Sequence, residues 1–180
     1  MDKVRNAVLP NDTLKKRASG LRYLWVTVLL VVIDQLTKVW VAAEYELYES
    51  RAVIDGLFNF TYVHNYGAAF SFLSDSGGWQ RWLFTAIAIA ISAVLLIWLR
   101  RNPVNFWRQN LSFALILSGA IGNVADRLMY GYVIDFLDVH YQGWHWPAFN
   151  VADMAITIGA ALMLFEAFVD NRRDDEENSK

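Results

Sequence analysis

The sequence contains no cysteine and only three histidines among its 180 residues. Without cysteine the chain has no disulfide framework, no thiolate metal site and no thiol nucleophile. The histidines, His64, His140 and His145, are too scattered along the chain to predict a zinc site, and we expect no cofactor. Any chemistry that the chain performs must therefore come from other side chains.

Charge is also scarce. Asp, Glu, Lys and Arg make up 19% of the residues, and the formal net charge is −2. We do not expect nucleic-acid binding, because the chain lacks the positive field that displaces counterions from phosphates. Hydrophobic residues make up 56%, which excludes global disorder and, with so little charge, is typical of a membrane protein. The length suits a single domain, residues 1–180.

Four long apolar stretches predict four membrane-spanning helices. Each contains 18–20 residues, and about 20 helical residues cross a bilayer core of roughly 30 Å. Tryptophans gather at the ends of these stretches, as in the aromatic belts of membrane proteins. The predicted spans are residues 24–43, 82–99, 111–130 and 151–169.

The positions of Lys and Arg predict the orientation of the spans. Residues 1–22 contain six basic side chains, whereas residues 44–80 contain only Arg51 and residues 131–150 contain none. By the positive-inside rule, the basic N-terminus and the tail of residues 170–180 are cytoplasmic, and the two weakly basic loops face outward. A cleaved signal peptide is the alternative for the first span. Its apolar run is longer than the usual 7–15 residues or so and contains an acid and a base, so we expect it to be retained.

The first outer loop is not expected to be a simple linker. Residues 57–73 alternate aromatic side chains such as Phe58, Phe60 and Tyr62 with smaller or polar ones. Such alternation predicts a strand, and its aromatic face is suited to resting on the bilayer surface.

Several ionisable or polar residues lie inside the predicted spans, where they are costly and often functional. Asp34 and Lys38 are spaced i and i+4, so they can pair on one helix face, for structural or functional reasons. Asn123, Asp126 and Arg127 are spaced i, i+3 and i+4, which predicts one shared side facing the bundle interior. There Asp126 either neutralises Arg127 in an interhelical clamp or joins a functional site. The five donors of Arg127 suit binding to backbone carbonyls.

Two further acids, Asp135 and Asp153, lie at the outer ends of the third and fourth spans. In an apolar site two neighbouring carboxyl groups cannot easily both ionise, so one can accept a proton from water while the other donates one to a substrate oxygen. This arrangement suits peptide hydrolysis without a metal. Other interpretations remain open: Asn150 as an N-cap, Asp153 in a favourable helix dipole, or both acids in the proton relay of a transporter.

Other catalytic motifs give weaker signals or none. The sequence contains no His-Glu-x-x-His, Gly-x-Ser-x-Gly or Gly-x-Gly-x-x-Gly pattern. Residues 75–77, Asp-Ser-Gly, match the core of soluble aspartic proteases, but a single copy within a polar turn favours a loop.

Five sequence blocks in this order resemble one family, the bacterial lipoprotein signal peptidases, also called signal peptidase II. Each block alone is weak, but all five on four predicted spans are specific. The blocks are VIDQLTK (residues 32–38), NYGAAFSF (65–72), GNVADR (122–127), GYVIDF (131–136) and FNVAD (149–153).

The resemblance implies an aspartyl endopeptidase of the bacterial inner membrane with its active site on the periplasmic side. Such an enzyme removes the signal peptide of diacylglyceryl-modified prolipoproteins, cutting before the lipidated Cys, and is the target of globomycin-type peptide inhibitors. The implied fold is an all-α polytopic membrane protein, four transmembrane helices with a small periplasmic β-cradle, in contact with membrane lipid.

The resemblance also implies roles for individual residues. The catalytic pair is Asp135 and Asp153. The residues that line the site and bind the substrate backbone are Asn65, Asn123, Arg127 and Asn150, and those that support the architecture are Asp34, Lys38 and Asp126. A small proton-coupled transporter and a lipoprotein-binding chaperone are the alternatives from other functional classes.

Overall fold

The computed structural model describes residues 18–67 and 78–178, with residues 170–178 described by their backbone only. Four predictions therefore fall wholly or partly outside the described residues. They concern the basic N-terminus up to residue 17, the end of the predicted strand of residues 57–73, the Asp-Ser-Gly motif of residues 75–77, and the side chains of the tail.

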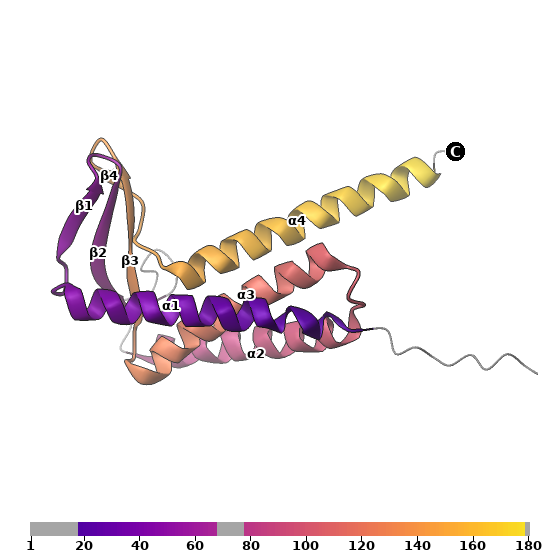
Figure 1. The fold of residues 1–180 in the computed structure, drawn as a ribbon, viewed down its shortest axis with the longest axis horizontal. Helices are drawn as coiled ribbons and strands as arrows, with labels where there is room; N and C mark the ends of the chain where they lie inside the picture. Colours follow the sequence, from indigo (N-terminus) through magenta and orange to yellow (C-terminus); the bar gives the residue numbers. More distant parts are fainter. Residues whose placement is uncertain (1–17, 68–77, 179–180) are drawn as a thin grey trace, which may run out of the picture.

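Four long helices form a bundle (Figure 1). Each contains a stretch long and apolar enough to cross a membrane, and α4 diverges from the others toward its C-terminal end (Figure 1). These helices and a small sheet confirm the expected fold class. The helices are α1 (Leu24–Glu44), α2 (Trp79–Arg101), α3 (Trp107–Met129) and α4 (Val151–Asn178), with a 3-10 helix, η1 (Gly20–Tyr23), before α1.

Helix α3 is the central helix of the bundle. In its most apolar stretch 61% of the residues are buried, against 17–28% in the other three helices. It packs against α1, α2 and α4, whose outward faces carry exposed large apolar side chains. Exposed apolar faces of this kind suit a lipid environment.

Glycines let α3 approach its neighbours closely. A Cβ on Gly119 would overlap the carbonyl oxygen of Ala152 in α4, and one on Gly122 would lie 2.6 Å from the Asp34 carboxylate of α1. Small residues at helix contacts are the usual means of close packing in membranes, because no hydrophobic force drives helices together there.

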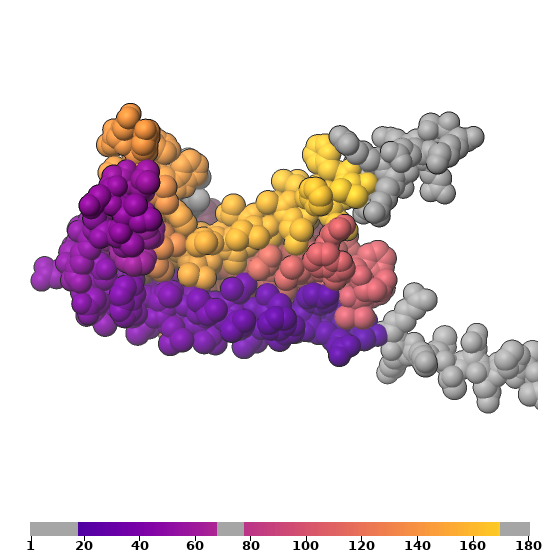
Figure 2. All heavy atoms as spheres, turned by 45° about the horizontal axis from the view of Figure 1, so that its top comes forward, coloured from indigo at the N-terminus to yellow at the C-terminus, as the bar shows by residue number. Residues whose placement is uncertain are grey.

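An antiparallel sheet lies across one end of the bundle, and Figure 2 shows a concave step between the sheet and α4. In β2–β3 pairing, Asn65 lies opposite Val133 and Val63 opposite Asp135. Gly131, with a φ of 90°, turns the chain from α3 into β3. The strands, in spatial order, are β1 (Ser50–Ile54), β2 (Phe58–Asn65), β3 (Val133–Tyr141) and β4 (Trp144–His145).

A small hydrophobic cluster fastens the sheet to the end of α1. Val41 of α1 and Tyr45, the residue that follows α1, pack against Tyr62 of β2 and against Ile134 and Phe136 of β3. Because Asp135 lies between Ile134 and Phe136 in β3, this packing also fixes the position of its carboxyl group relative to the bundle.

We predict that Gly119→Ala destabilises the bundle, although alanine favours a helix by about 1 kcal/mol over glycine. The added Cβ meets the backbone of α4, and overpacking of this kind costs about 1–3 kcal/mol. Thermal unfolding in detergent should therefore show a lower Tm. Ala86→Val, which adds carbon atoms on an exposed position of α2, should leave the Tm nearly unchanged, and equal Tm values for both variants would contradict the close approach.

Candidate active site

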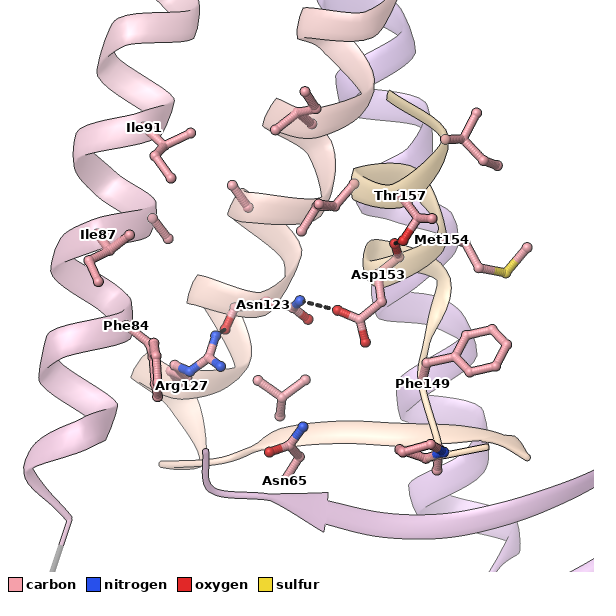
Figure 3. Close-up of a pocket in the computed structure, with 18 of the residues that line it drawn as sticks. Asn65, Phe84, Ile87, Ile91, Asn123, Arg127, Phe149, Asp153, Met154 and Thr157 are labelled. Carbon is pink, nitrogen blue, oxygen red and sulfur yellow. Dashed lines mark hydrogen bonds between the residues drawn. The ribbon is translucent and has the colours of Figure 1, made fainter. Parts of the chain in front are cut away.

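A cavity of about 610 Å³ opens between α2, α3 and α4, next to the sheet (Figure 3). Its wall is mainly apolar, and most of the apolar side chains come from the three helices. Its polar side chains gather near the sheet, where Asn123 faces Asp153 and Asn65 points into the same space from β2 (Figure 3). The polar lining residues are Asn65, Asn123, Arg127, Asp153 and Thr157.

Asp153 lies in the first turn of α4 and lines the cavity. Its backbone N–H donates to Asn150 Oδ1 at 2.9 Å, so Asn150 is indeed an N-cap. Its carboxylate Oδ1 accepts a hydrogen bond from Asn123 Nδ2 at 2.8 Å. The helix start and a neighbouring amide thus hold the Asp153 carboxyl group at the cavity wall.

Asp135 lies on β3 and is only 2% exposed. It is not among the described side chains that line the cavity, so it lies behind the wall rather than in it. Its Oδ1 accepts from Asn150 Nδ2 at 2.7 Å, and its Oδ2 accepts from Asn65 Nδ2 at 2.9 Å. Asn150 therefore contacts both acids: its amide nitrogen binds the carboxyl group of Asp135, and its oxygen binds the backbone N–H of Asp153.

Burial is the main reason that the pKa of Asp135 is raised, to about 7, and the charge of nearby Asp153 acts in the same direction. The hydrogen bonds from Asn65 and Asn150 lower the pKa but do not outweigh the burial. Near neutral pH, Asp135 is therefore divided between its protonated and ionised forms. A pair of this kind holds one proton and one negative charge between two carboxyl groups.

Arg127 contacts backbone carbonyls. Its Nη2 donates to the Gly67 oxygen at 3.0 Å and its Nη1 to the Asn123 oxygen at 3.4 Å. Of the two alternatives for Asp126, the interhelical clamp in which it neutralises Arg127 is wrong, and Asp126 and Arg127 do not share one side as predicted. Adjacent residues on a helix point about 100° apart, so Asp126 faces α1 and pairs with Lys38 at 2.9 Å, while Arg127 faces the cavity.

The expected pair of Asp34 and Lys38 belongs to a larger buried group. Lys38 Nζ lies 2.9 Å from both Asp34 Oδ2 and Asp126 Oδ2, and all three side chains are at most 1% exposed. Gln35 Nε2 donates to Asp34 Oδ2 at 3.1 Å and to Asp126 Oδ1 at 2.9 Å. Sequence reasoning did not single out Gln35, although a polar amide inside a predicted span was the available signal. We call these four residues the α1–α3 polar cluster.

The α1–α3 polar cluster binds the backbone beside each acid. Asp34 Oδ1 accepts from the N–H of Ala152, the residue before Asp153, at 2.8 Å. Asp126 Oδ2 accepts from the N–H of Ile134, the residue before Asp135, at 3.1 Å. Through these two bonds, one ion cluster determines where both carboxyl groups lie.

The histidines pack within the sheet region. The His64 ring stacks on Tyr132 with centroids 3.6 Å apart, and His140 stacks on His145 at 4.7 Å. Within residues 18–67 and 78–169, no group of three or more His, Cys, Asp or Glu side chains is placed to hold a metal ion.

Four membrane helices, an end-on sheet and a cavity lined by Asp153, with Asp135 buried behind its wall, define a polytopic membrane enzyme. The family model described as signal peptidase (SPase) II matches residues 26–169. The chain therefore belongs to the signal peptidase II family, whose members are membrane proteases, and the resemblance drawn from the five blocks is confirmed.

Individual relatives agree with this family. The lipoprotein signal peptidase of Shewanella halifaxensis is 56% identical over 156 residues, covering 87% of this chain and 91% of the relative. The lipoprotein signal peptidase of Shewanella pealeana is 53% identical over 160 residues, covering 89% of this chain and 94% of that relative. A bacterial membrane enzyme solved by the in meso method at 2.3 Å resolution has a TM-score of 0.76 and 31% identity, covering 83% of this chain and 89% of that chain.

We predict that Lys38→Met strongly destabilises the protein, because it leaves two buried carboxylates without their cation. Removing one partner of a buried ion pair costs about 3–5 kcal/mol, and the free energy of unfolding in detergent should fall by that amount. Arg108→Met is the control, since it breaks the partly exposed pair with Glu166 at 3.5 Å and should cost at most about 1 kcal/mol. Equal losses of unfolding free energy in the two variants would show that the buried ion cluster contributes no more to stability than the partly exposed pair.

Proposed function

We propose that this chain is an aspartic endopeptidase that removes the signal peptide from diacylglyceryl-modified prolipoproteins, cutting before the lipidated Cys. The observation that carries the proposal is the double contact of Asn150, which donates to Asp135 Oδ1 and caps the helix that bears Asp153. One amide thus binds the carboxyl group of Asp135 and the backbone N–H of Asp153. Two carboxyl groups placed in this way beside a cavity can activate a water molecule without a metal.

In the proposed reaction the two acids act as a unit. The ionised carboxylate takes a proton from water as the water oxygen bonds to the scissile carbonyl carbon. The protonated carboxyl group donates a hydrogen bond to the developing oxyanion. The oxyanion then re-forms the carbonyl as the C–N bond breaks, and the leaving nitrogen takes up a proton from the pair of carboxyl groups, which by then holds two. The two acids share their proton as a pair, and the position of Asp153 at the cavity wall favours its carboxylate as the group that meets the water.

The apolar part of the cavity suits the apolar helix of a signal peptide. Starting at its polar end, the cavity is lined along α2 by side chains from Phe84 to Ile91. A second, apolar cavity adjoins it, because Ile91 and Ile116 line both, and this second cavity extends to Trp98. Phe84 to Trp98 covers roughly 21 Å of helix. That length matches the apolar core of a signal peptide, about 7–15 residues.

The polar end of the cavity suits the cleavage site of the substrate. Asn65, Asn123 and Arg127 bring amide and guanidinium donors there from β2 and α3, and such donors bind backbone carbonyls. We infer that globomycin-type peptide inhibitors bind at the same end. The basic N-terminus supports an inner-membrane protein with both termini cytoplasmic and the site on the periplasmic side, in contact with membrane lipid.

We predict that Asp135→Asn and Asp153→Asn each abolish cleavage of a diacylglyceryl-modified prolipoprotein by purified enzyme in detergent without metal. An amide can neither accept the proton from water nor share one, so kcat should fall at least about 10³-fold while substrate binding persists. Asp55→Asn, at the exposed β1–β2 turn, is the charge-matched control and should keep wild-type kcat. If either variant kept near-normal turnover, that acid would be structural; a chaperone would lose no function in any of the three.

We also predict a loss of activity on the alkaline side. Because the pKa of Asp135 is raised to about 7, the pair keeps its shared proton below that pH and loses it above. The kcat/KM should therefore fall about tenfold per pH unit above neutrality. Initial rates between pH 5 and 9, with Tm measured at each pH to exclude unfolding, test this, and a constant kcat/KM up to pH 9 would contradict proton sharing.

A further inference from the structure

The far end of the sheet carries a side-chain network that the proposed reaction does not use. At its centre is Asp138 of β3, which is only 6% exposed. Its carboxylate accepts hydrogen bonds from Asn59 Nδ2 at 3.2 Å, Thr61 Oγ1 at 3.3 Å and His145 Nδ1 at 2.8 Å. His140, stacked on His145, closes the network through a 3.2 Å contact between its Nε2 and Asn59 Oδ1.

His145 is the closest donor to Asp138 in this network. Its Nδ1 lies 2.8 Å from Oδ1 and 3.0 Å from Oδ2, whereas Asn59 Nδ2 and Thr61 Oγ1 lie 3.2 and 3.3 Å from Oδ2. A buried carboxylate that loses its best donor is poorly satisfied. The pair therefore binds β4 to β3 through side chains as well as backbone.

This attachment matters because β4 leads directly into the cavity wall. Strand β4 pairs with β3 at two positions, opposite His140 and Tyr141. The next four residues, 146–149, all line the cavity. They run beside β3, with the Trp146 N–H donating to the Val139 oxygen at 2.8 Å and the Phe149 N–H to the Leu137 oxygen at 3.1 Å. We call residues 146–149 the wall segment.

We propose that Asp138 and His145 are positioning residues that hold the wall segment against β3 and so set the KM for the lipoprotein substrate. This inference rests on the proposed function, because it takes the cavity as the substrate site. If the wall segment detaches in a fraction of molecules, those molecules bind substrate poorly and the apparent affinity falls in proportion. The pair of acids is held by side-chain hydrogen bonds from Asn65, Asn123 and Asn150, none of which involves the wall segment, so kcat is unaffected once substrate is bound.

The test compares His145→Leu with His145→Asn in the full chain in detergent, using a diacylglyceryl-modified prolipoprotein peptide. We expect His145→Leu to raise KM about fivefold, the inverse of the competent fraction, with kcat within about twofold of wild type. Because the Asn amide nitrogen can take the place of Nδ1 and donate to Asp138, His145→Asn should restore KM. Asp138→Asn, which keeps the shape but removes the charge, should raise KM as His145→Leu does, and the exposed Asp55→Asn should not.

Hydrogen exchange gives a second readout that does not need activity. Amides of the wall segment should exchange faster in His145→Leu than in wild type or His145→Asn, while those of α3 stay unchanged. An unaltered KM in His145→Leu, an equal loss in kcat, or no rescue by Asn would overturn the inference. If wild type itself does not cleave the peptide, the proposed function fails instead, and unchanged exchange in His145→Leu would then overturn the positioning role separately.

Discussion

The structure depends on one buried ammonium group, Lys38, held between the carboxylates of Asp34 and Asp126. Burying three charges in a membrane bundle is costly unless their hydrogen-bonding capacity is fully used. The carboxylate oxygens meet this requirement: Asp34 Oδ1 accepts from the N–H of Ala152, and Asp126 Oδ1 accepts from Gln35 Nε2. Asp126 Oδ2, which contacts Lys38, also accepts from the N–H of Ile134. Helix α1 contributes no described side chain to the cavity wall, yet through these bonds it fixes the backbone beside both acids.

Neighbouring residues on α3 have different roles, one in the buried ion cluster and the other at the cavity. Asp126 faces α1 and carries the ion cluster, while Arg127, one residue on, faces the cavity. Asn123 serves both sides, because its oxygen accepts from Lys38 Nζ at 3.1 Å and its nitrogen donates to Asp153. A change in the buried cluster thus reaches the cavity through this amide as well as through the backbone bonds of Ala152 and Ile134. Close packing at Gly119 leaves α3 and α4 little freedom to absorb such a change.

The spans were predictable because apolar length and Trp position are local signals, and the pair of Asp34 and Lys38 was predictable from its i, i+4 spacing. The pairing of strands far apart in the sequence was not predictable. Strand β3 pairs with β2, some 70 residues earlier, and Asp135 and Asp138 interrupt the apolar pattern that would mark it as a strand. The choice of Lys38 over Arg127 as the partner of Asp126 depends on which helix lies opposite. The burial of Asp135 behind the cavity wall likewise follows from the seating of the sheet on Val41 and Tyr45, which no local pattern encodes.

The kinds of donor around the two acids explain how the pair can share a proton. Three amides, Asn65, Asn123 and Asn150, donate to the carboxyl groups, and amides bind an oxygen without adding a positive charge. A cation in their place would favour ionisation of both acids and lower their pKa values. Lys38 donates to Asn123 instead of Asp153, and Arg127 donates to backbone carbonyls. Neither Lys38 nor Arg127 is hydrogen-bonded to the two acids directly. Burial is therefore the main influence on the pKa of Asp135, which stays near neutrality.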